Sequence, residues 1–431
     1  MQLETIQQEM TSLNPLRVAA LIDLPRSPLS GGHIKGWERI AQAAAQSDLP
    51  LDLTLYCSGE TLTETLSDKA RIKQLPPVFS TEKLKFLPYV PDNTDLAKYH
   101  RTLAEELIHY DVIHTTDGFF AYAQTAEKVK ATYGIPIVTS FHTDTPAYAR
   151  VFTKLTIEKI FGEGILSKFL IETLRLPERQ EAKKRKRLKK HLTACSAALY
   201  TREEDHQLAA SVIGDENTHV IRLGVDRHMF GPHRMSRDEV EVTYRIPAEQ
   251  VIILFVGRLD VGKNIYTLIE ALENLIAEGK PVHLITAGLG PAANDLKERL
   301  GDHVTVAGFV HPEDLAVLYA SADLLALTSE VEIRSMAGVE AMTSGLPVLV
   351  SEKSGIAKLF DYTPAMDVVP SGVENWTNAL RDIVNSKNKR IHMSKVASAY
   401  ADTHIANWTD VLAEDLLPAW HKAAIAAKIM R

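Results

Sequence analysis

The first half of the chain alternates short apolar runs with segments of helical spacing. A continuous apolar run is typical of a buried strand, whereas apolar residues three and four positions apart are typical of a helix. Repetition of the two patterns predicts a parallel, doubly wound α/β sheet. Strands are predicted at 17–22, 53–57, 111–114 and 135–141, with one helix at 31–45 and another before the last strand.

The same pattern restarts near residue 251 and predicts a second α/β domain. Val251–Val256 and Leu324–Leu327 are continuous apolar runs, and each is expected to be a strand enclosed on both faces. An amphipathic helix is predicted from Ile265 through Leu272. We interpret the hydrophilic segment 226–250 as the crossing between the domains.

These patterns set the domain boundaries. The first domain is predicted to cover 1–225 and the second 226–404, followed by a terminal segment, 405–431. That segment contains a helix predicted from Trp408 to Ala427, in which Pro418 is expected to cause a kink.

Composition agrees with a two-domain protein and excludes other classes. The chain has 431 residues, of which 45% are hydrophobic and 24% charged, so wholesale disorder is not expected. No run approaches the length of a membrane span, and the N-terminus lacks the features of a signal peptide, so we expect a cytoplasmic protein. Cys57 and Cys195 lie far apart in apolar settings and are expected to be buried free thiols rather than a disulfide.

Charged side chains follow two of the predicted strands in the second domain. Arg258 and Lys263 come after 251–256, and Glu332 and Glu340 come after 324–327. Loops at the carboxyl ends of parallel strands are where α/β proteins bind ligands. Arginine and lysine suit a diphosphate, and carboxylates suit the hydroxyls of ribose or sugar. The pattern indicates a nucleotide-sugar site, although two glutamates at this spacing also occur by chance, and Glu340 could instead cap a turn and Arg258 form a surface ion pair.

A helix predicted to open near Ser335 adds to that site. Free amide groups in its first turn, at Ser335, Met336 and Ala337, would point toward the same sheet edge as the cations. The positive end of the helix dipole favours an anion there. We therefore expect a phosphate to sit at this helix start.

Many short motifs in one order resemble the retaining glycosyltransferases of the two-domain GT-B fold, the family often called GT4. The resemblance covers nearly the whole chain and implies two Rossmann-like domains facing a cleft, with the terminal segment packing back on the first domain. The motifs are Gly31-Gly32, His142 after its strand, 194–196, 223–226 with Phe230 and Pro232, 256–258, Lys263-Asn264, 287–291, 306–310, 340–342 and 345–348.

The resemblance implies a role for each site residue. Arg258 and Lys263 would stabilise charge on the leaving diphosphate, Glu332 would bind sugar hydroxyls and Glu340 the ribose. His142 would lie beside the transferred sugar, and His33 and Asp144 are weaker candidates for the acceptor side. The remaining donor-site positions would be Gly31, Gly32, Gly288, Val310, Ser335, Met336 and Ala337. Taken alone, Gly31-Gly32 is a plain turn, His142 a histidine capped by a carbonyl and Asp144 a turn residue.

The segment after the first carboxylate departs from the common family pattern. Many members place glycine, an aromatic residue and glycine there, whereas this chain has Ile333, Arg334 and Ser335. The stretch 330–335 looks nearer to glycolipid-forming members, as does the Phe-His-Thr-Asp context of His142. The expected activity is transfer of a hexose, from a UDP-sugar in preference to GDP-mannose, to a lipid, a lipid-linked saccharide or another glycan.

No metal or other cofactor is expected. The sequence contains no Asp-x-Asp pair, and none of its sixteen histidines falls into a recognised metal-binding spacing. The two cations and the helix amides can neutralise the diphosphate in place of a divalent ion.

Seven cations fall within residues 183–190, although the formal net charge of the chain is −7. Such a run is either a solvated helix face or, with the apolar stretch 165–176 before it, an interfacial element attracted to anionic lipid at the inner face of a membrane. Nucleic-acid binding is disfavoured, because the run lacks interleaved aromatic residues and the protein is acidic. A catalytically inactive GT-B scaffold, or a membrane-surface binding protein, is the alternative to an enzyme.

Overall fold

The computed structural model describes residues 15–27, 30–80, 95–162, 164–332, 335–359 and 366–429. The chain divides into two compact units, which we describe separately. Unit 1 is Met1–Arg222 with Trp408–Arg431, and unit 2 is Leu223–Asn407. The predicted boundaries are at residues 225 and 404, whereas residues 223–225 and 405–407 both lie with unit 2.

Unit 1 is built on an eight-stranded sheet. Its order is β3-β4-β2-β1-β5-β6-β7-β8, and only β3 runs antiparallel to its neighbour among the described strands. All four strands predicted for this half are present. The strand bounds are β1 Leu16–Pro25, β2 Leu51–Ser58, β3 Leu62–Thr65, β4 Ala70–Leu75, β5 Val112–Thr115, β6 Ile137–Ser140, β7 Ala197–Tyr200 and β8 Thr218–Val220.

The helices of unit 1 include the two that the sequence predicts. α2 (Gly32–Gln46) buries Ile34, Trp37 and Ile40, which share one face at helical spacing. α4 (Ala121–Tyr133) ends at Gly134 in a left-handed conformation, the usual glycine stop. Outside the hairpin and the terminal segment described below, the other described helices are α3 (Arg101–Leu107), α8 (Glu203–Ile213) and the short 3₁₀ helix Asp215–Asn217.

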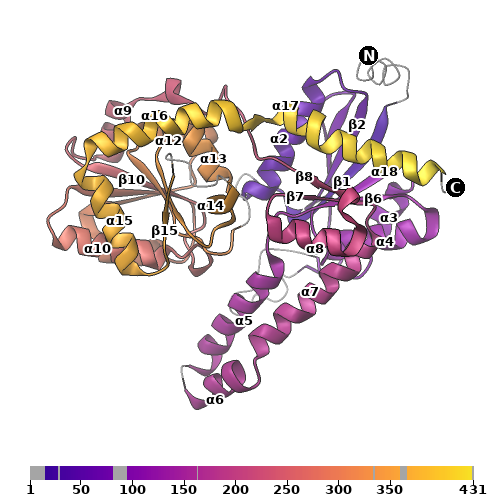
Figure 1. Cartoon of the computed structure of the whole chain (residues 1–431), viewed down its shortest axis with the longest axis horizontal. Coiled ribbons are helices and arrows are strands. Elements are labelled where there is room, and N and C mark those ends of the chain that lie inside the picture. Colours follow the sequence, from indigo (N-terminus) through magenta and orange to yellow (C-terminus); the bar gives the residue numbers. More distant parts are fainter. Residues whose placement is uncertain are drawn as a thin grey trace. The chain divides into compact units, whose positions relative to one another are not determined.

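A helical hairpin is inserted between β6 and β7. It consists of α5 (Thr145–Phe161), α6 (Ile165–Lys168), a π-helical stretch (Phe169–Thr173) and α7 (Leu176–Ala194). α5 and α7 lie side by side and carry α6 at their far end (Figure 1). We call this hairpin the arm and residues 160–162 with 164–169 its tip.

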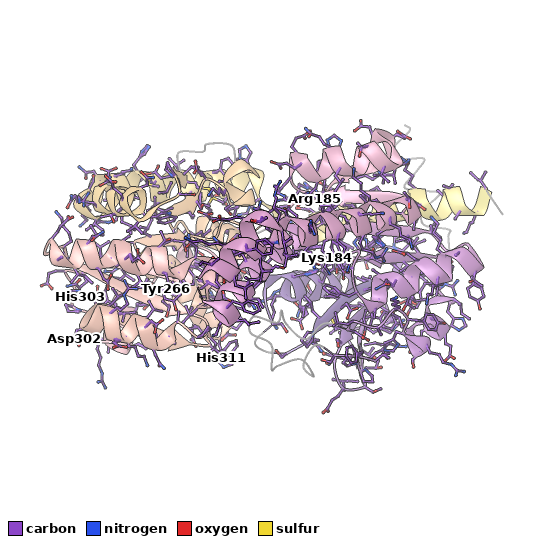
Figure 2. All side chains as sticks on the ribbon, turned by 90° about the horizontal axis from the view of Figure 1, so that it is seen from below. Lys184, Arg185, Tyr266, Asp302, His303 and His311 are labelled. Carbon is purple, nitrogen blue, oxygen red and sulfur yellow. The ribbon has the colours of Figure 1, made fainter. Side chains whose placement is uncertain are left out.

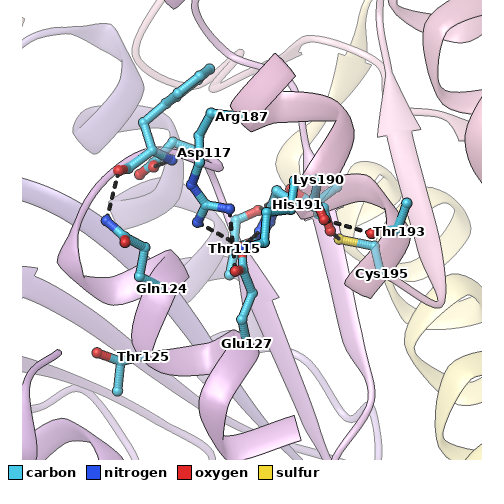
Figure 3. Close-up of polar contacts among 12 residues, drawn as sticks. Thr115, Asp117, Gln124, Thr125, Glu127, Arg187, Lys190, His191, Thr193 and Cys195 are labelled. Carbon is cyan, nitrogen blue, oxygen red and sulfur yellow. Dashed lines mark hydrogen bonds and ion pairs between the residues drawn. The ribbon is translucent and has the colours of Figure 1, made fainter. Parts of the chain in front are cut away.

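A buried network fixes the base of the arm to the sheet (Figure 3). His191 on α7 contacts Glu127 on α4 at 2.7 Å and Thr115 on β5 at 2.9 Å. Arg187 forms an ion pair with the same carboxylate at 2.7 Å. Burial lowers the pKa of His191, but Cys195 and Glu127 raise it more strongly, to about 10. A protonated imidazole therefore joins α7 to α4.

The terminal segment packs on unit 1, and its helix changes from π to α just before Pro418, where a kink is predicted. α17 (Trp408–Asp410) is followed by a π-helical stretch (Val411–Leu416) and α18 (Leu417–Ile429). Pro418 lies in the first turn of α18. The lack of an N–H group in proline is tolerated in a first turn, because amides there have no acceptor within the α-helix. Trp420 on α18 is fully buried and donates to His114 on β5 at 2.9 Å.

Unit 2 contains a six-stranded parallel sheet in the order β12-β11-β10-β13-β14-β15. The two predicted strands appear as β10 (Val251–Val256) and β13 (Leu324–Leu327) with unchanged bounds. The chain builds outward from β10 to β12 and then restarts at β13 on the other side. In sheets of this kind ligands bind at the carboxyl ends of the strands where the order reverses, here β10 and β13.

Helices cover both faces of this sheet (Figure 1). α10, α11 and α15 pack on one face and α9, α12, α13 and α16 mainly on the other. The remaining bounds are β9 Gly224–Val225, α9 Arg237–Tyr244, α10 Ile265–Ala277, β11 Val282–Ala287, α11 Ala293–Leu300, β12 Val304–Gly308, α12 Pro312–Ser321, α13 Met336–Thr343, β14 Val348–Ser351, α14 Gly355–Leu359, β15 Met366–Val369, α15 Val373–Asn385, α16 Lys387–His404 and β16 Ala406–Asn407, with 3₁₀ helices at Pro232–Arg234, Val261–Lys263 and Gly301–His303.

The interpretation of 226–250 as a crossing between domains is wrong. This segment forms α9 and belongs to unit 2, where Phe230, Val240 and Ile246 are buried in the core. The polar residues that suggested a linker lie on the outer face of α9, whose inner face contributes one buried residue, Val240.

Two predictions about the whole chain concern thiols and membrane spans. Cys57 and Cys195 are both free and buried, as predicted. Among the described helices, none is both long and apolar enough to cross a bilayer.

Candidate functional site

The loop after β10 carries both predicted cations. Asp260 caps the 3₁₀ turn by accepting from the Lys263 amide at 3.1 Å, and it also pairs with the Arg258 guanidinium at 3.2 Å. Arg258 is partly exposed, with 46% of its side chain accessible, whereas Lys263 retains 21%. Asp260 thus shapes the loop and orients one cation.

Hydrogen bonds join this loop to the one after β13. The Thr328 hydroxyl donates to the Lys263 carbonyl at 2.8 Å, and the Asn264 side chain donates to the Thr328 carbonyl at 3.3 Å. Ser329 donates to the Gly262 carbonyl at 3.4 Å. Because the loops are held together, the Lys263 ammonium reaches the Glu332 carboxylate at 3.0 Å. The structure therefore brings together a cation and a carboxylate that the sequence predicts for one site.

α13 begins where the sequence predicts, with Ser335 as its N-cap. The Ser335 hydroxyl accepts from the Gly338 amide at 3.4 Å, while Met336 and Ala337 occupy the first turn, whose amides have no intrahelical acceptor. The predicted departures Ile333 and Arg334 lie outside the described residues.

Gly338 allows the start of α13 to lie close to its neighbours. A Cβ at this position would come within 2.5 Å of the Ile356 side chain and 3.1 Å of the Leu327 side chain. Glycine thus places the first turn of the helix directly against the end of β13. The amides of that turn are held near the Glu332 loop.

Glu340 lies within α13, as predicted, and accepts from the hydroxyl of Tyr319 at 3.1 Å. Tyr319 is fully buried, and burial raises its pKa well above the usual value, with further contributions from Glu340 and Glu332. The phenol therefore stays protonated and donates, which orients the Glu340 carboxylate.

Gly288 and Val310 occupy structural positions near the same sheet edge. The Gly288 amide donates to the Gly308 carbonyl at 2.7 Å, and a Cβ on Gly288 would lie 1.9 Å from the Gly257 carbonyl oxygen. Glycine at 288 is therefore required by the close approach of two loops. Val310 packs its side chain on the core of unit 2. His311, one residue further on at the start of α12, is seen in Figure 2.

Unit 1 holds the remaining predicted residues. Gly31 is the N-cap of α2 and has open space around it, since an added Cβ would meet nothing within 4 Å. Gly32 opens the helix and is exposed. The rings of His33 and His142 stack with their centroids 4.3 Å apart. Asp144 caps α5 by accepting from the Ala147 amide at 3.0 Å, which fits the reading of this residue as a turn former.

Hydrogen bonds around His142 define its tautomer. Trp420 can only donate, so Nδ1 of His114 accepts and Nε2 of His114 carries the proton, which it donates to Ser140 at 2.8 Å. Nε2 of His142 faces two donors, the Ser140 hydroxyl at 2.7 Å and the Trp37 indole at 3.3 Å. It must accept, so neutral His142 carries its proton on Nδ1. Burial lowers the pKa of His114 to about 3, which keeps this ring neutral.

Sequence reasoning missed the residues that position the site. Asp260, Thr328 and Tyr319 act on their neighbours through hydrogen bonds that no spacing rule reveals. Asp260 alone offered a signal, because an aspartate before a short turn is a common cap. Ser140 lies two residues before His142 and contacts it directly. Its connection to Trp420 runs through His114, and Trp420 and His114 are 306 positions apart in the sequence.

Comparison with known proteins supports the fold and part of the function. Residues 236–399 match the family described as "Glycosyl transferases group 1". A GDP-mannose-dependent alpha-(1-6)-phosphatidylinositol dimannoside mannosyltransferase of Mycobacterium tuberculosis is 30% identical over 177 residues, which cover 40% of this chain and 45% of that protein. The chain spans about half the length of the curated relatives it matches, between 52% and 59% for three of them.

Solved structures match nearly the whole chain. A sucrose-phosphate synthase from Thermosynechococcus elongatus has a TM-score of 0.70 at 18% identity, covering 96% of this chain and 99% of that one. Anabaena HepE in complex with UDP and glucose has a TM-score of 0.63 at 15% identity, covering 92% and 97% of the two chains. The predicted fold class is confirmed: the chain has the GT-B glycosyltransferase fold, with parallel sheets in two Rossmann-like units.

Proposed function

We propose that this protein is a retaining glycosyltransferase that moves a hexose from a nucleotide diphosphate sugar to a lipid, a lipid-linked saccharide or another glycan. The observation that carries the proposal is the 3.0 Å pair of Lys263 and Glu332 at the strand ends where the sheet order of unit 2 reverses. The match of residues 236–399 to the glycosyltransferase family supports it.

The donor half of the reaction rests on unit 2. Lys263 and Arg258 would stabilise the negative charge that grows on the leaving diphosphate, together with the amides of Met336 and Ala337. On donor binding, the Lys263 ammonium would contact a phosphate oxygen and its ion pair with Glu332 would weaken. Glu332 would then be free to accept hydroxyls of the sugar, and Glu340, held by Tyr319, would accept from the ribose.

Two similarities bear on the donor. HepE was solved with UDP and glucose, whereas the mycobacterial relative is named for GDP-mannose. The first likeness spans nearly the whole chain and the second less than half, so we favour a UDP-sugar.

The acceptor half rests on unit 1. The Nδ1–H of His142 is a hydrogen-bond donor held in a fixed orientation by Trp37 and Ser140. We propose that it donates to a hydroxyl of the transferred sugar in an oxocarbenium-like transition state. The mycobacterial relative is named for a phosphatidylinositol dimannoside acceptor, which favours a lipid or lipid-linked acceptor here.

The reaction is proposed to need no metal, because the two cations and the helix amides would carry out the neutralisation. Purified protein would be incubated with a panel of UDP- and GDP-hexoses, and release of free nucleotide would be measured with and without EDTA. Release from one donor, unchanged by EDTA, is the expected result.

Two other outcomes would speak against parts of this proposal. Binding of a nucleotide without turnover, with any acceptor tried, would support an inactive scaffold instead. Loss of turnover in EDTA that is restored by Mg²⁺ would overturn the metal-independent mechanism alone.

A further inference from the structure

The tip of the arm exposes an unusual concentration of apolar side chains. Of twenty exposed large hydrophobic residues in the described part of the chain, five lie within the nine described positions of the tip. Ile165 is 90% exposed, and the exposures of the others are Ile160 51%, Phe161 47%, Leu166 50% and Phe169 47%. Single exposed hydrophobic residues need no explanation, but a cluster of this kind marks a contact surface.

The basic run divides into an inner and an outer set. Lys184 lies over the rings of Phe119 and Phe120, 5.4 and 5.5 Å from their centroids, and burial lowers its pKa. Arg187 pairs with Glu127 and Arg185 with Glu181. Figure 2 shows Lys184 and Arg185 on α7. Three of the seven cations thus serve contacts within unit 1.

Of the outer cations Lys183, Lys186, Lys189 and Lys190, all but Lys189 lie on the same side of the helix as Arg179, which precedes the run by one turn. Arg179, Lys183, Lys186 and Lys190 are all exposed and follow one another by four, three and four positions along α7. At about 100° per residue they lie within about 60° of one another around the helix axis. We call these four residues the cationic stripe. It begins near the apolar tip and continues toward the base of the arm.

The arm is held firmly at its base. The Glu127, Arg187 and His191 network joins α7 to α4, and α5 packs along α7 (Figure 3). The stripe and the tip are therefore fixed to the sheet of unit 1 at a set distance from each other. A flat surface that binds the tip can therefore also contact the stripe.

We propose that the arm docks on an anionic lipid bilayer, with the apolar tip inserted among the lipids and the cationic stripe facing the headgroups. Apolar insertion beside a cationic helix face is the chemistry of an interfacial membrane element. A bilayer fits both features, because the exposed side chains among the described tip residues are apolar apart from that of Lys168, itself a cation, and a second copy would oppose its own like-charged stripe. The chain carries a net charge of −7, so anionic membranes would repel the rest of its surface.

This inference stands apart from the proposed reaction, and its test needs no enzymatic activity. The full-length protein would be sedimented with vesicles of phosphatidylcholine alone and with vesicles containing one third phosphatidylglycerol. We expect at least about tenfold stronger binding to the anionic vesicles, since each cation near the surface contributes measurably, and a marked loss in high salt.

Two arm variants and two matched controls complete the test. The first variant combines Lys183→Glu, Lys186→Glu and Lys190→Glu, and the second combines Ile165→Ser and Phe169→Ser. Each is expected to weaken binding to anionic vesicles about tenfold or more. The controls are Lys297→Glu with Lys387→Glu and Lys395→Glu, and Val242→Ser with Ile391→Ser, all at exposed positions of unit 2. They are expected to change binding less than about twofold, and unchanged melting temperatures would show that each variant folds.

Three results would overturn the inference. The first is equal binding to neutral and anionic vesicles, and the second is an equal loss of vesicle binding in the arm and control variants. The third is a dimer of the wild type, detected by sedimentation velocity, that is absent in the Ile165→Ser, Phe169→Ser variant. The last result would identify the tip as a contact between two copies of the chain.

Discussion

The tautomer of His142 is set by side chains that come from distant parts of unit 1. Indole donors stand at both ends of the hydrogen-bonded chain, Trp420 at one and Trp37 at the other. Because an indole nitrogen can only donate, the direction of every bond between them follows. Ser140 acts as a positioning residue for the ring that the proposed mechanism uses.

Replacement of Ser140 tests this arrangement. In protein labelled with ¹⁵N-histidine, the ring of His142 is expected to show a protonated Nδ1 and an unprotonated Nε2. Ser140→Ala removes the stronger donor, so the second tautomer is expected to appear, and turnover is expected to fall about tenfold.

Thr139→Ser, which can keep the hydrogen bond from residue 139 to the Thr115 carbonyl, is the control and is expected to leave the spectrum unchanged. A wild-type His142 protonated on Nε2 would contradict the assignment.

At this scale the sequence predicts some of the site and not the rest. Lys263 and Glu332 each follow an apolar run, so their meeting at one sheet edge could be expected. The bond from Trp420 to His114 could not, because it depends on where the terminal helix packs. Gly288 stays a predicted donor-site residue, and the sequence does not reveal that its amide donates to the Gly308 carbonyl or that its small size allows two loops to pack closely.

At the scale of elements, α13 combines a position in the core with a role in the site. Changing a helical glycine to alanine raises the free energy of unfolding by about 1 kcal/mol where the added methyl group meets no obstacle. At Gly338 the added methyl group would lie 2.5 Å from Cδ1 of Ile356 and 3.1 Å from Cδ1 of Leu327, and both buried side chains would have to shift within the core. We therefore expect Gly338→Ala to lower the free energy of unfolding by about 1–3 kcal/mol in urea titrations. A stabilised variant would mean that the start of α13 lies farther from β13 than the structure places it.

The base of the arm gives a pH-dependent contribution to stability. The pKa of His191 is raised to about 10 in the folded protein, against about 6.5 for an unperturbed histidine. Its stabilising effect is therefore complete below about pH 6.5 and is lost as the pH rises toward 10. The pKa of Glu127 is lowered, because bonds from His191 and Arg187 outweigh burial, so its contribution is lost in acid.

Comparison with His191→Gln isolates this effect. The difference in unfolding free energy between wild type and the variant is expected to shrink between pH 6.5 and 10, by at most about 1.4 kcal/mol per pH unit. Urea titrations at pH 6, 8 and 9.5 would measure it. A difference that does not vary with pH would mean that His191 is neutral in the folded protein.

Elements were predicted well where periodicity is strong and poorly where polar residues conceal a buried stripe. β10 and β13 have the predicted bounds, since both are continuous apolar runs. The sequence of α9 is typical of a linker, because Val240 is the one residue that the helix buries. The apolar character of 165–176 is evident from the sequence, but its place at the end of a hairpin is not, because it depends on the pairing of α5 with α7.

At the scale of the whole molecule, alternation of strands and helices was enough to predict two doubly wound units. Each sheet reverses its order beside its first strand, β1 in unit 1 and β10 in unit 2. The candidate residues follow from that topology: Gly31, Gly32 and His142 come after strands of unit 1, and Arg258, Lys263 and Glu332 after strands of unit 2. The facing of the two units across a cleft stays a prediction.

Lys263 is proposed to belong to a binding site for a nucleotide diphosphate. Titration calorimetry of UDP and GDP against wild type and Lys263→Met measures its contribution, with Lys353→Met as control because Lys353 also pairs with a carboxylate, Glu330, at 3.0 Å. We expect a loss of about ten- to hundredfold in affinity for Lys263→Met, since a hydrogen bond to a charged group contributes about 1.5–3 kcal/mol, and no change for the control. Equal affinities of wild type and Lys263→Met would contradict it.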